Sequence, residues 1–354
     1  MSLIYKPDFG RARNYWEAFW NHAIIDRPIV CINAPLDNVQ PQPSMPYMSG
    51  FDGDYLSALE IYDRWAASVY FGGESIPYCD LSFGPDQFAA FLGADLIMAK
   101  EQETSWVKPF VTDWNEIQVS LDMRPNSRWN MMIDFMTAGA RFSAGKFLLG
   151  MLDLHSNMDC LMAMRGSQDL CMDLINNGDE VERVLKEVRH LYQPVYENLY
   201  FSGGMDKRGT IGWSPIYCEG KSAVIQCDFI CLIGPKHARR FVIPAIEEEA
   251  AYLDHCVYHY DGPDALRHLD DILSIADIDV IQWVPGDGRP RSPEWIDLLK
   301  KIQGAGKGLW LFDWTIADIK KHYRELNPEG LCFQLEAASQ TEAEELLRWF
   351  TQNT

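Results

Sequence analysis

The sequence is poor in basic residues. It has 31 lysines and arginines against 51 aspartates and glutamates, which gives a formal net charge of −20 at pH 7. A chain this acidic is repelled by the phosphates of nucleic acids and by anionic membrane faces. We therefore expect neither a nucleic acid nor a membrane as a partner.

Signals of several other protein classes are also missing. No stretch approaches the length of a transmembrane helix without a charge, and the first residues have no apolar signal-peptide core. The nine cysteines are an odd number without a Cys-x-x-Cys pair, so neither a disulfide framework nor a zinc ribbon is indicated. Buried, reduced thiols are the simpler interpretation, and we predict a soluble cytoplasmic protein.

What the sequence does have is a regular alternation of short apolar runs and amphipathic stretches from about residue 140 onward. The predicted strands are Lys146–Met151, Ala223–Phe229, Cys256–Tyr260, Val280–Val284, Leu309–Phe312 and Leu331–Leu335. The predicted helices between and after them are 178–202, 235–254, 263–275, 292–303, 315–325 and 340–352. Strands that alternate with helices predict βα units and a parallel sheet.

The N-terminal part is less regular. Residues 10–22 and 54–71 are predicted helices, Pro28–Ala34 is a predicted buried strand, and 36–53 is the most loop-like segment. No Gly-x-Gly-x-x-Gly loop follows an early strand, which favours a closed sheet over an open dinucleotide-binding one. The predicted fold class is thus α/β, a (β/α)₈ TIM barrel with extra N-terminal helices. We expect one domain over 1–354, in which 1–75 forms a helical extension and the first strand.

Polar residues end six of the apolar runs. In a parallel barrel these ends meet at one mouth, where active sites lie, so we expect a small-molecule pocket there. The candidate residues are Asp153, His155, Gln226, Asp228, His259, Asp261, Gln282, Trp283, Asp313, Gln334 and Glu336. Any single acid among them can instead cap a helix, as Asp261 and Asp313 could, and tryptophans such as Trp283 often pack in cores.

The order of these features resembles the uroporphyrinogen decarboxylase superfamily, and more closely its corrinoid- or thiol-dependent methyltransferases. The likeness is carried by KFLLGMLDLHSNMDCLMAMRGSQDL, by QCDFICLIGPKHARRF, by YHYDG and by DIDVIQW, and it covers roughly residues 75–350. The resemblance implies a barrel enzyme that transfers a methyl group between a corrinoid protein, or a small methyl donor, and an acceptor. Corrinoid would come only with a partner protein, and a homo-oligomer would be compatible with this class.

The resemblance also implies a metal site, with zinc as the first choice of divalent metal. His259 matches the histidine of the family's His-x-Cys motif, and Asp261 stands at the position of its cysteine. The later ligand would be Cys332 or Glu336. On this interpretation His259, Asp261 and Asp228 are catalytic, and the substrate-binding residues are Asp153, His155, Gln226, Gln282, Trp283 and Asp313.

Three alternatives remain open from the sequence. His259 and Asp261 could form a metal-free acid–base pair. A glycoside hydrolase could use two carboxyl groups among Asp228, Asp261 and Glu336. The protein could also be a non-catalytic barrel that binds a small molecule without converting it.

Overall fold

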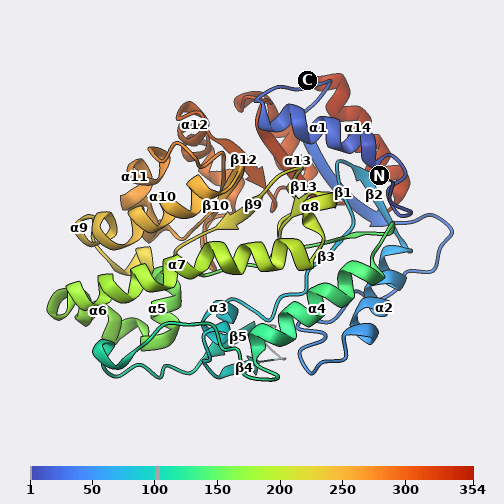
Figure 1. Ribbon diagram of the computed structural model, residues 1–354. Coiled ribbons are helices and arrows are strands. Elements are labelled where there is room, and N and C mark those ends of the chain that lie inside the picture. Colours follow the sequence, from blue (N-terminus) through green and yellow to red (C-terminus); the bar gives the residue numbers. More distant parts are fainter. Residues whose placement is uncertain (1, 100–103) are drawn as a thin grey trace.

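The computed structural model describes residues 2–99 and 104–354, so Met1 and residues 100–103 of the predicted domain lie outside the described residues. Its centre is a seven-stranded sheet with the order β2-β1-β13-β12-β11-β10-β9 (Figure 1). All neighbours in this sheet pair in parallel except β2, which is antiparallel to β1. The strands are β1 (Ile29–Pro35), β2 (Val69–Gly73), β9 (Ser222–Ile225), β10 (His255–Asp261), β11 (Val280–Val284), β12 (Gly308–Leu311) and β13 (Leu331–Glu336).

Three short strand pairs accompany this sheet. β3 (Tyr78–Cys79) and β6 (Leu148–Leu149) are parallel, while β4 (Leu96–Ala99) with β5 (Thr104–Val107) and β7 (Thr210–Ile211) with β8 (Tyr217–Cys218) are antiparallel. A parallel bridge joins Gly150 to Ile211. The predicted α/β class with a central parallel sheet is confirmed. The strand pairs among the described residues do not link into a closed ring.

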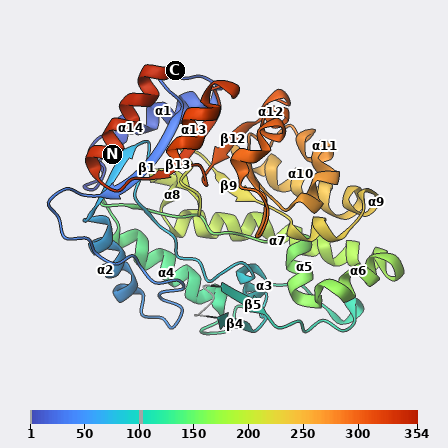
Figure 2. The same ribbon diagram turned by 180° about the vertical axis from the view of Figure 1, so that it is seen from behind.

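Helices follow most strands, as the alternation predicts. They are α1 (Phe9–Trp20), α2 (Tyr55–Ala66), α3 (Gln87–Phe91), α4 (Arg128–Phe142), α5 (Met158–Arg165), α6 (Ser167–Asn176), α7 (Gly178–Ser202), α8 (Met205–Arg208), α9 (Pro235–His237), α10 (Ile243–Tyr252), α11 (Leu269–Leu273), α12 (Ile296–Gly304), α13 (Ile316–His322) and α14 (Gln340–Asn353). Seen from behind, α14 lies beside β1 and α1, so both ends of the chain pack at the same place (Figure 2). Among the described residues no helix has the length and apolarity needed to cross a membrane.

The helix predicted over 235–254 is interrupted. α9 and α10 are separated by a π-helical turn at Ala238–Val242. Pro244, the second residue of α10, has no N–H to donate to the preceding turn, and this accounts for the widened hydrogen-bonding there.

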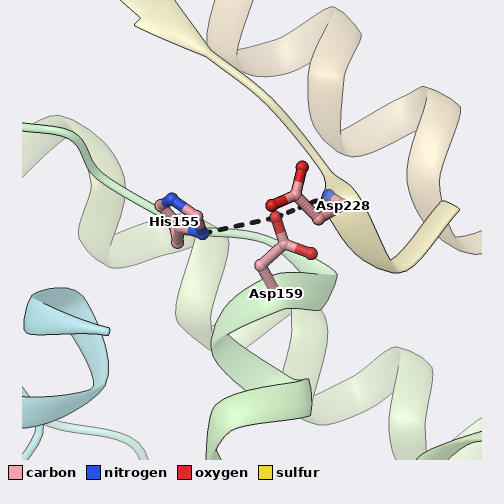
Figure 3. A group of neighbouring side chains, drawn as sticks. All are labelled: His155, Asp159 and Asp228. Atoms are coloured by element: carbon pink, nitrogen blue, oxygen red, sulfur yellow. Dashed lines mark hydrogen bonds and ion pairs between the residues drawn. The ribbon is translucent and has the colours of Figure 1, made fainter. Parts of the chain in front are cut away.

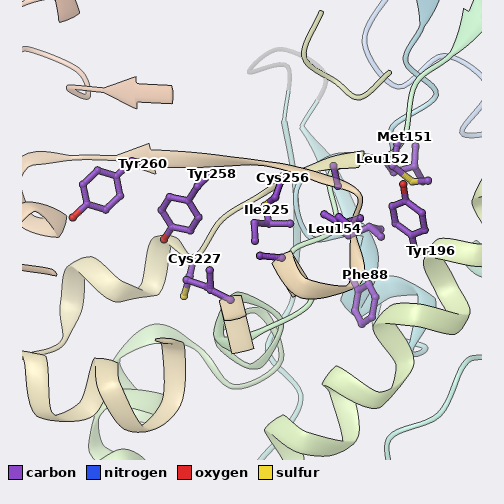
Figure 4. Packing of buried hydrophobic residues seen from close by; sticks show 14 of the residues in the cluster. Phe88, Met151, Leu152, Leu154, Tyr196, Ile225, Cys227, Cys256, Tyr258 and Tyr260 are labelled. Atoms are coloured by element: carbon purple, nitrogen blue, oxygen red, sulfur yellow. The ribbon is translucent and has the colours of Figure 1, made fainter. Parts of the chain in front are cut away.

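The two faces of the sheet bury different apolar clusters. On the face that packs against α1, alternate strand residues form one cluster, which we call the α1-face cluster; its members include Ile29, Cys31, Val224, Val257, Val280, Trp310 and Cys332. The residues between them pack into a larger cluster under the other helices, including Ile225, Cys256, Tyr258 and Tyr260 (Figure 4). Because side chains alternate along a strand, each strand residue is assigned to one face by its position.

Candidate functional site

A row of polar side chains lies next to the α1-face cluster. Two residues after Cys31, Val224, Val257, Val280 and Cys332, the same face of each strand or its extension carries Asn33, Gln226, His259, Gln282 and Gln334. This spacing of two keeps the polar residue on the face of its apolar neighbour, one step nearer the carboxyl end of the strand. On this face of the sheet, a layer of apolar side chains is therefore followed by a layer of polar side chains nearer the carboxyl ends of the strands.

His259 is fixed in this layer by the neighbouring strand. It pairs in register with Gln282, and its Nδ1 lies 2.5 Å from the Oε1 of that residue. The indole of Trp213 packs edge-on against the imidazole, with 5.6 Å between the ring centroids. Because an amide oxygen only accepts, Nδ1 is the donor in this contact, and Nε2 is the nitrogen left for another partner.

His259 belongs to a group of three possible ligands with Asp228 and Asp261. One donor atom from each of the three residues lies within 4.8 Å of the others. Asp261 is the last residue of β10, and its Oδ1 is buried without a hydrogen-bond partner among the described residues. A buried carboxylate oxygen without a donor is costly, so this atom is suited to a ligand that the chain itself does not supply.

A second group, His155, Asp159 and Asp228, shares Asp228 with the first (Figure 3). In this group the carboxylate of Asp159 already has partners within the protein. It accepts hydrogen bonds from the backbone N–H groups of Asp228 at 2.9 Å and Phe229 at 2.8 Å, and it pairs with Nδ1 of His155 at 3.5 Å. This group therefore anchors the turn that carries Asp228.

His155 is surrounded by acids. Its Nε2 lies 3.0 Å from Oδ2 of Asp153 and also contacts the side-chain amide of Gln226. Burial alone would lower the pKa of His155, but the carboxylates of Asp153, Asp159 and Asp228 raise it to about 10. The carboxylates around the ring therefore favour its charged form, in which it pairs with Asp153 and Asp159.

Burial also affects Asp228. It raises the pKa of this carboxyl to about 6, with a further rise from Asp159, while His155 and His259 act in the opposite direction. Asp228 begins a 3-10 turn directly after the extension of β9. It stands between the anchoring group and the group at His259.

Some predicted site residues do not join either group. Cys332 is fully buried in the α1-face cluster, and Glu336 is exposed at the end of β13. The ring of Trp283 packs against Tyr260 and Trp295 on the other face of β11, so alternation along the strand turns it away from His259. Asp313 accepts hydrogen bonds from the backbone N–H and the hydroxyl of Ser292, which gives it a role in holding that turn.

Sequence reasoning missed two buried acids near the site. Asp159 lies in the first turn of α5, where Asn157 caps the helix, and the motif after His155 was the available signal. Glu249, on α10, accepts from the hydroxyl of Ser156 at 2.8 Å and from the amide of Asn157 at 3.2 Å. Burial raises the pKa of Glu249 to about 8. Nothing in the local pattern of a helix such as α10 marks a glutamate as buried beside a distant loop.

A cavity of about 310 Å³ lies beside this polar layer. Asn33 and Gln334 of the layer line it, together with Asp80, which follows β3. Asp153 follows β6, the parallel partner of β3. Desolvation raises the pKa of Asp80, and the carboxylate of Asp153 adds to the rise. The cavity and the acidic residues therefore belong to one end of the sheet.

A comparison with solved structures shows a shared fold. No protein-family model and no curated protein matches the sequence. The structure is similar to that of a methyltransferase from Methanosarcina mazei, with a TM-score of 0.63 and 12% sequence identity over 96% of this chain and 98% of that one. At this identity the likeness establishes a shared architecture, and the chain has the fold of that methyltransferase along nearly its whole length.

Proposed function

We propose that the protein is a methyltransferase with a divalent metal at His259, Asp261 and Asp228. The observation that carries the proposal is this group of three ligands at the carboxyl ends of parallel strands, in a fold that a methyltransferase also has. As in the superfamily that the sequence resembles, the methyl group would pass between a corrinoid partner protein, or a small methylated compound, and an acceptor.

We also infer that the sheet and the short strand pairs together make one (β/α)₈ barrel in a single domain. The parallel pairing of β3 with β6 and the bridge from Gly150 to Ile211 extend the sheet toward closure. The α1-face cluster supports this inference, because it draws Leu148 and Ile211 into contact with residues of the seven-stranded sheet.

The residues fit a metal. An imidazole and two carboxylates suit zinc, manganese or iron, and Asp261 offers an oxygen that no protein group uses among the described residues. Gln282 would act behind His259, because a partner on the second ring nitrogen fixes the orientation and basicity of a ligating histidine. A bound divalent metal would lower the pKa of a thiol or hydroxyl acceptor and hold it as the anion.

The chain would supply the rest of the site. Asp159 and His155 hold the turn that presents Asp228, and Asp228 can accept a proton from the acceptor group. Cys332 and Glu336, the later ligands that the resemblance implies, do not group with His259 among the described residues. We therefore assign the third position to Asp228.

Metal content and methyl transfer test the proposal together. Protein purified without chelators should contain about one divalent metal per chain, and His259→Ala and Asp261→Ala should each lose it. Trp283→Phe, on the other face of β11, is the matched control and should keep it. With methylcobalamin as donor and a small thiol as acceptor, the loss of methylcobalamin absorbance should depend on His259.

Two results would overturn the proposal. One is fresh protein without metal that cannot be loaded with zinc, manganese or iron. The other is methyl transfer that His259→Ala leaves unchanged. Hydrolysis of chromogenic glycosides that is lost in Asp228→Asn and Glu336→Gln would indicate a glycoside hydrolase instead, and ligand-induced thermal stabilisation without any turnover would indicate a binding protein.

A further inference from the structure

The cavity beside the polar layer has a carboxylate but no basic side chain. Asp80 lines it, and no lysine, arginine or histidine is among the described residues that do. The Oδ1 atom of Asp80 accepts one hydrogen bond, 3.1 Å from the backbone nitrogen of Ser82, and the carboxylate forms no ion pair with any described residue. Asp80 is partly buried and has no counter-charge among the described residues, so a cationic ligand would stabilise its carboxylate.

Five aromatic residues and two methionines contribute to the walls of the cavity. Tyr47, Tyr62, Trp65, Phe71 and Tyr78 line it, with the thioethers of Met45 and Met48. The rings of Tyr62 and Trp65 lie 5.2 Å apart, and those of Trp65 and Phe71 lie 5.9 Å apart. No lysine or arginine of the described chain stacks on Tyr62, Trp65, Phe71 or Tyr78. Where these rings border the cavity, they can therefore receive a cation from outside.

The apolar walls distinguish between kinds of cation. A primary ammonium group has three N–H donors that each require an acceptor, whereas a fully alkylated one has none and presents methyl groups to its surroundings. Aromatic rings and thioethers suit the second kind, as in the aromatic cages that bind quaternary ammonium groups. The composition of the cavity thus favours an alkylated cation.

Two amide donors line another part of the cavity. Oδ1 of Asn33 accepts from the hydroxyl of Ser75 at 2.6 Å, and Oε1 of Gln334 accepts from the indole of Trp310 at 3.0 Å. Because both carbonyl oxygens are engaged, the amide N–H groups of Asn33 and Gln334 remain as donors. They would suit an oxygen acceptor on the same ligand.

We propose that this cavity binds a small alkylated ammonium ion that also carries an oxygen acceptor, with the ammonium group beside Asp80. That such a compound is the methylated substrate rests on the proposed function. The binding itself does not, since it depends on the cavity residues and not on the metal ligands.

Choline and its uncharged carbon analogue, 3,3-dimethylbutan-1-ol, are the probes, because they have the same shape and differ in charge. By calorimetric titration, the protein should bind choline at least about ten-fold more tightly than the alcohol. Asp80→Asn should bring the two affinities close together, while Asp52→Asn, an exposed acid on the neighbouring loop, should leave their ratio unchanged.

Further variants keep the test decisive. Trp65→Leu should weaken choline binding several-fold with Asp80 intact, which covers the case in which Asp80→Asn fails to fold. His259→Ala should bind choline as the natural protein does. Choline binding can therefore be tested even if the protein binds no metal or transfers no methyl group. Equal affinity of the natural protein for the two probes, or choline binding that Asp80→Asn does not weaken, would overturn the inference.

Discussion

The Nδ1 atom of His259 on β10 lies 2.5 Å from the Oε1 atom of Gln282 on β11. The two residues are paired in register, so the sheet itself sets the contact. Gln282 is buried, so the contact is shielded from solvent. Among the described residues, Gln282 is the hydrogen-bond partner that orients the His259 ring.

The variant Gln282→Leu tests whether this hydrogen bond affects metal binding by His259. Leucine keeps the volume but cannot accept from Nδ1, so we expect metal affinity to fall about 10- to 100-fold while the fold is retained. Competition titration with a chromogenic chelator measures the change. Trp283→Phe, the next residue along β11, should bind metal normally; equal affinity in Gln282→Leu and the natural protein would show that the contact does not tune a ligand.

Asp159 should matter for stability more than for chemistry. It is 1% exposed and accepts two backbone N–H groups. Asp159→Asn leaves one of those donors without its acceptor and removes the charge opposite His155, so the free energy of unfolding should fall by about 1–3 kcal/mol. Urea denaturation measures it, with Asp169→Asn on the exposed side of α6 as the control. An unchanged midpoint would contradict this role.

Glu249 should make stability depend on pH. Burial raises its pKa from 4.5 to about 8 in the folded protein, whereas the unfolded chain releases the proton near the ordinary value. Between these two values the unfolded state is favoured as pH rises, so stability falls from about pH 4.5 to 8. Glu249→Gln, which stays neutral, should gain on the order of 1–3 kcal/mol relative to the natural protein between pH 5 and 8.

Thermal or urea unfolding at several pH values measures this difference. Glu247→Gln, two residues earlier on α10 and exposed, is the control and should follow the pH profile of the natural protein. Parallel profiles for Glu249→Gln and the natural protein would mean that Glu249 is charged in the folded state.

Choline binding should depend on the protonation of Asp80. Burial raises the pKa of Asp80 to about 6, and the nearby carboxylate of Asp153 adds to the rise, while Tyr78 beside it stays neutral in this range. As pH falls through about 6 the carboxyl group takes up a proton, so affinity for choline should drop below that pH. Titrations from pH 5 to 8 test this, and Asp80→Asn should give a flat profile. A flat profile in the natural protein would contradict the role of this carboxylate.

Much of the fold follows from the sequence because strand and helix signals are local. Val280–Val284 and Gly178–Ser202 have the predicted bounds, and α1 lies in the predicted helical region 10–22 except for its first residue. The helix predicted over 54–71 is too long, because α2 ends at Ala66 and the β-branched and aromatic residues from Val69 onward form β2. The interruption at Ala238–Val242 was not predicted, because apolar periodicity does not register a shift from an α turn to a π turn. The proposed closure of the sheet would depend on short pairs such as β3 with β6, whose two-residue strands give almost no local signal.

The site was predictable only in part. Residues at the ends of apolar runs, among them His155, Asp228, His259 and Gln282, do lie together in the structure. Strand face explains Trp283, which is adjacent to Gln282 in sequence but packs on the opposite face of β11. Cys332 lies on the same face as Gln334, but it is buried two residues earlier in the α1-face cluster. Asp159 and Glu249 act through tertiary contacts with segments 69 to 93 residues away, and no local pattern reports such distances.

One wall of the cavity consists of five consecutive residues, 44–48, from the loop between β1 and α2, whereas Asn33 and Gln334 belong to paired strands. The loop that forms this wall is therefore separate from the strands that form the sheet. Changes of sequence or length in this loop could retune which compound is accepted while the strands that hold His259 stay unaltered. Relatives with the same sheet and a different loop would then be expected to act on different compounds.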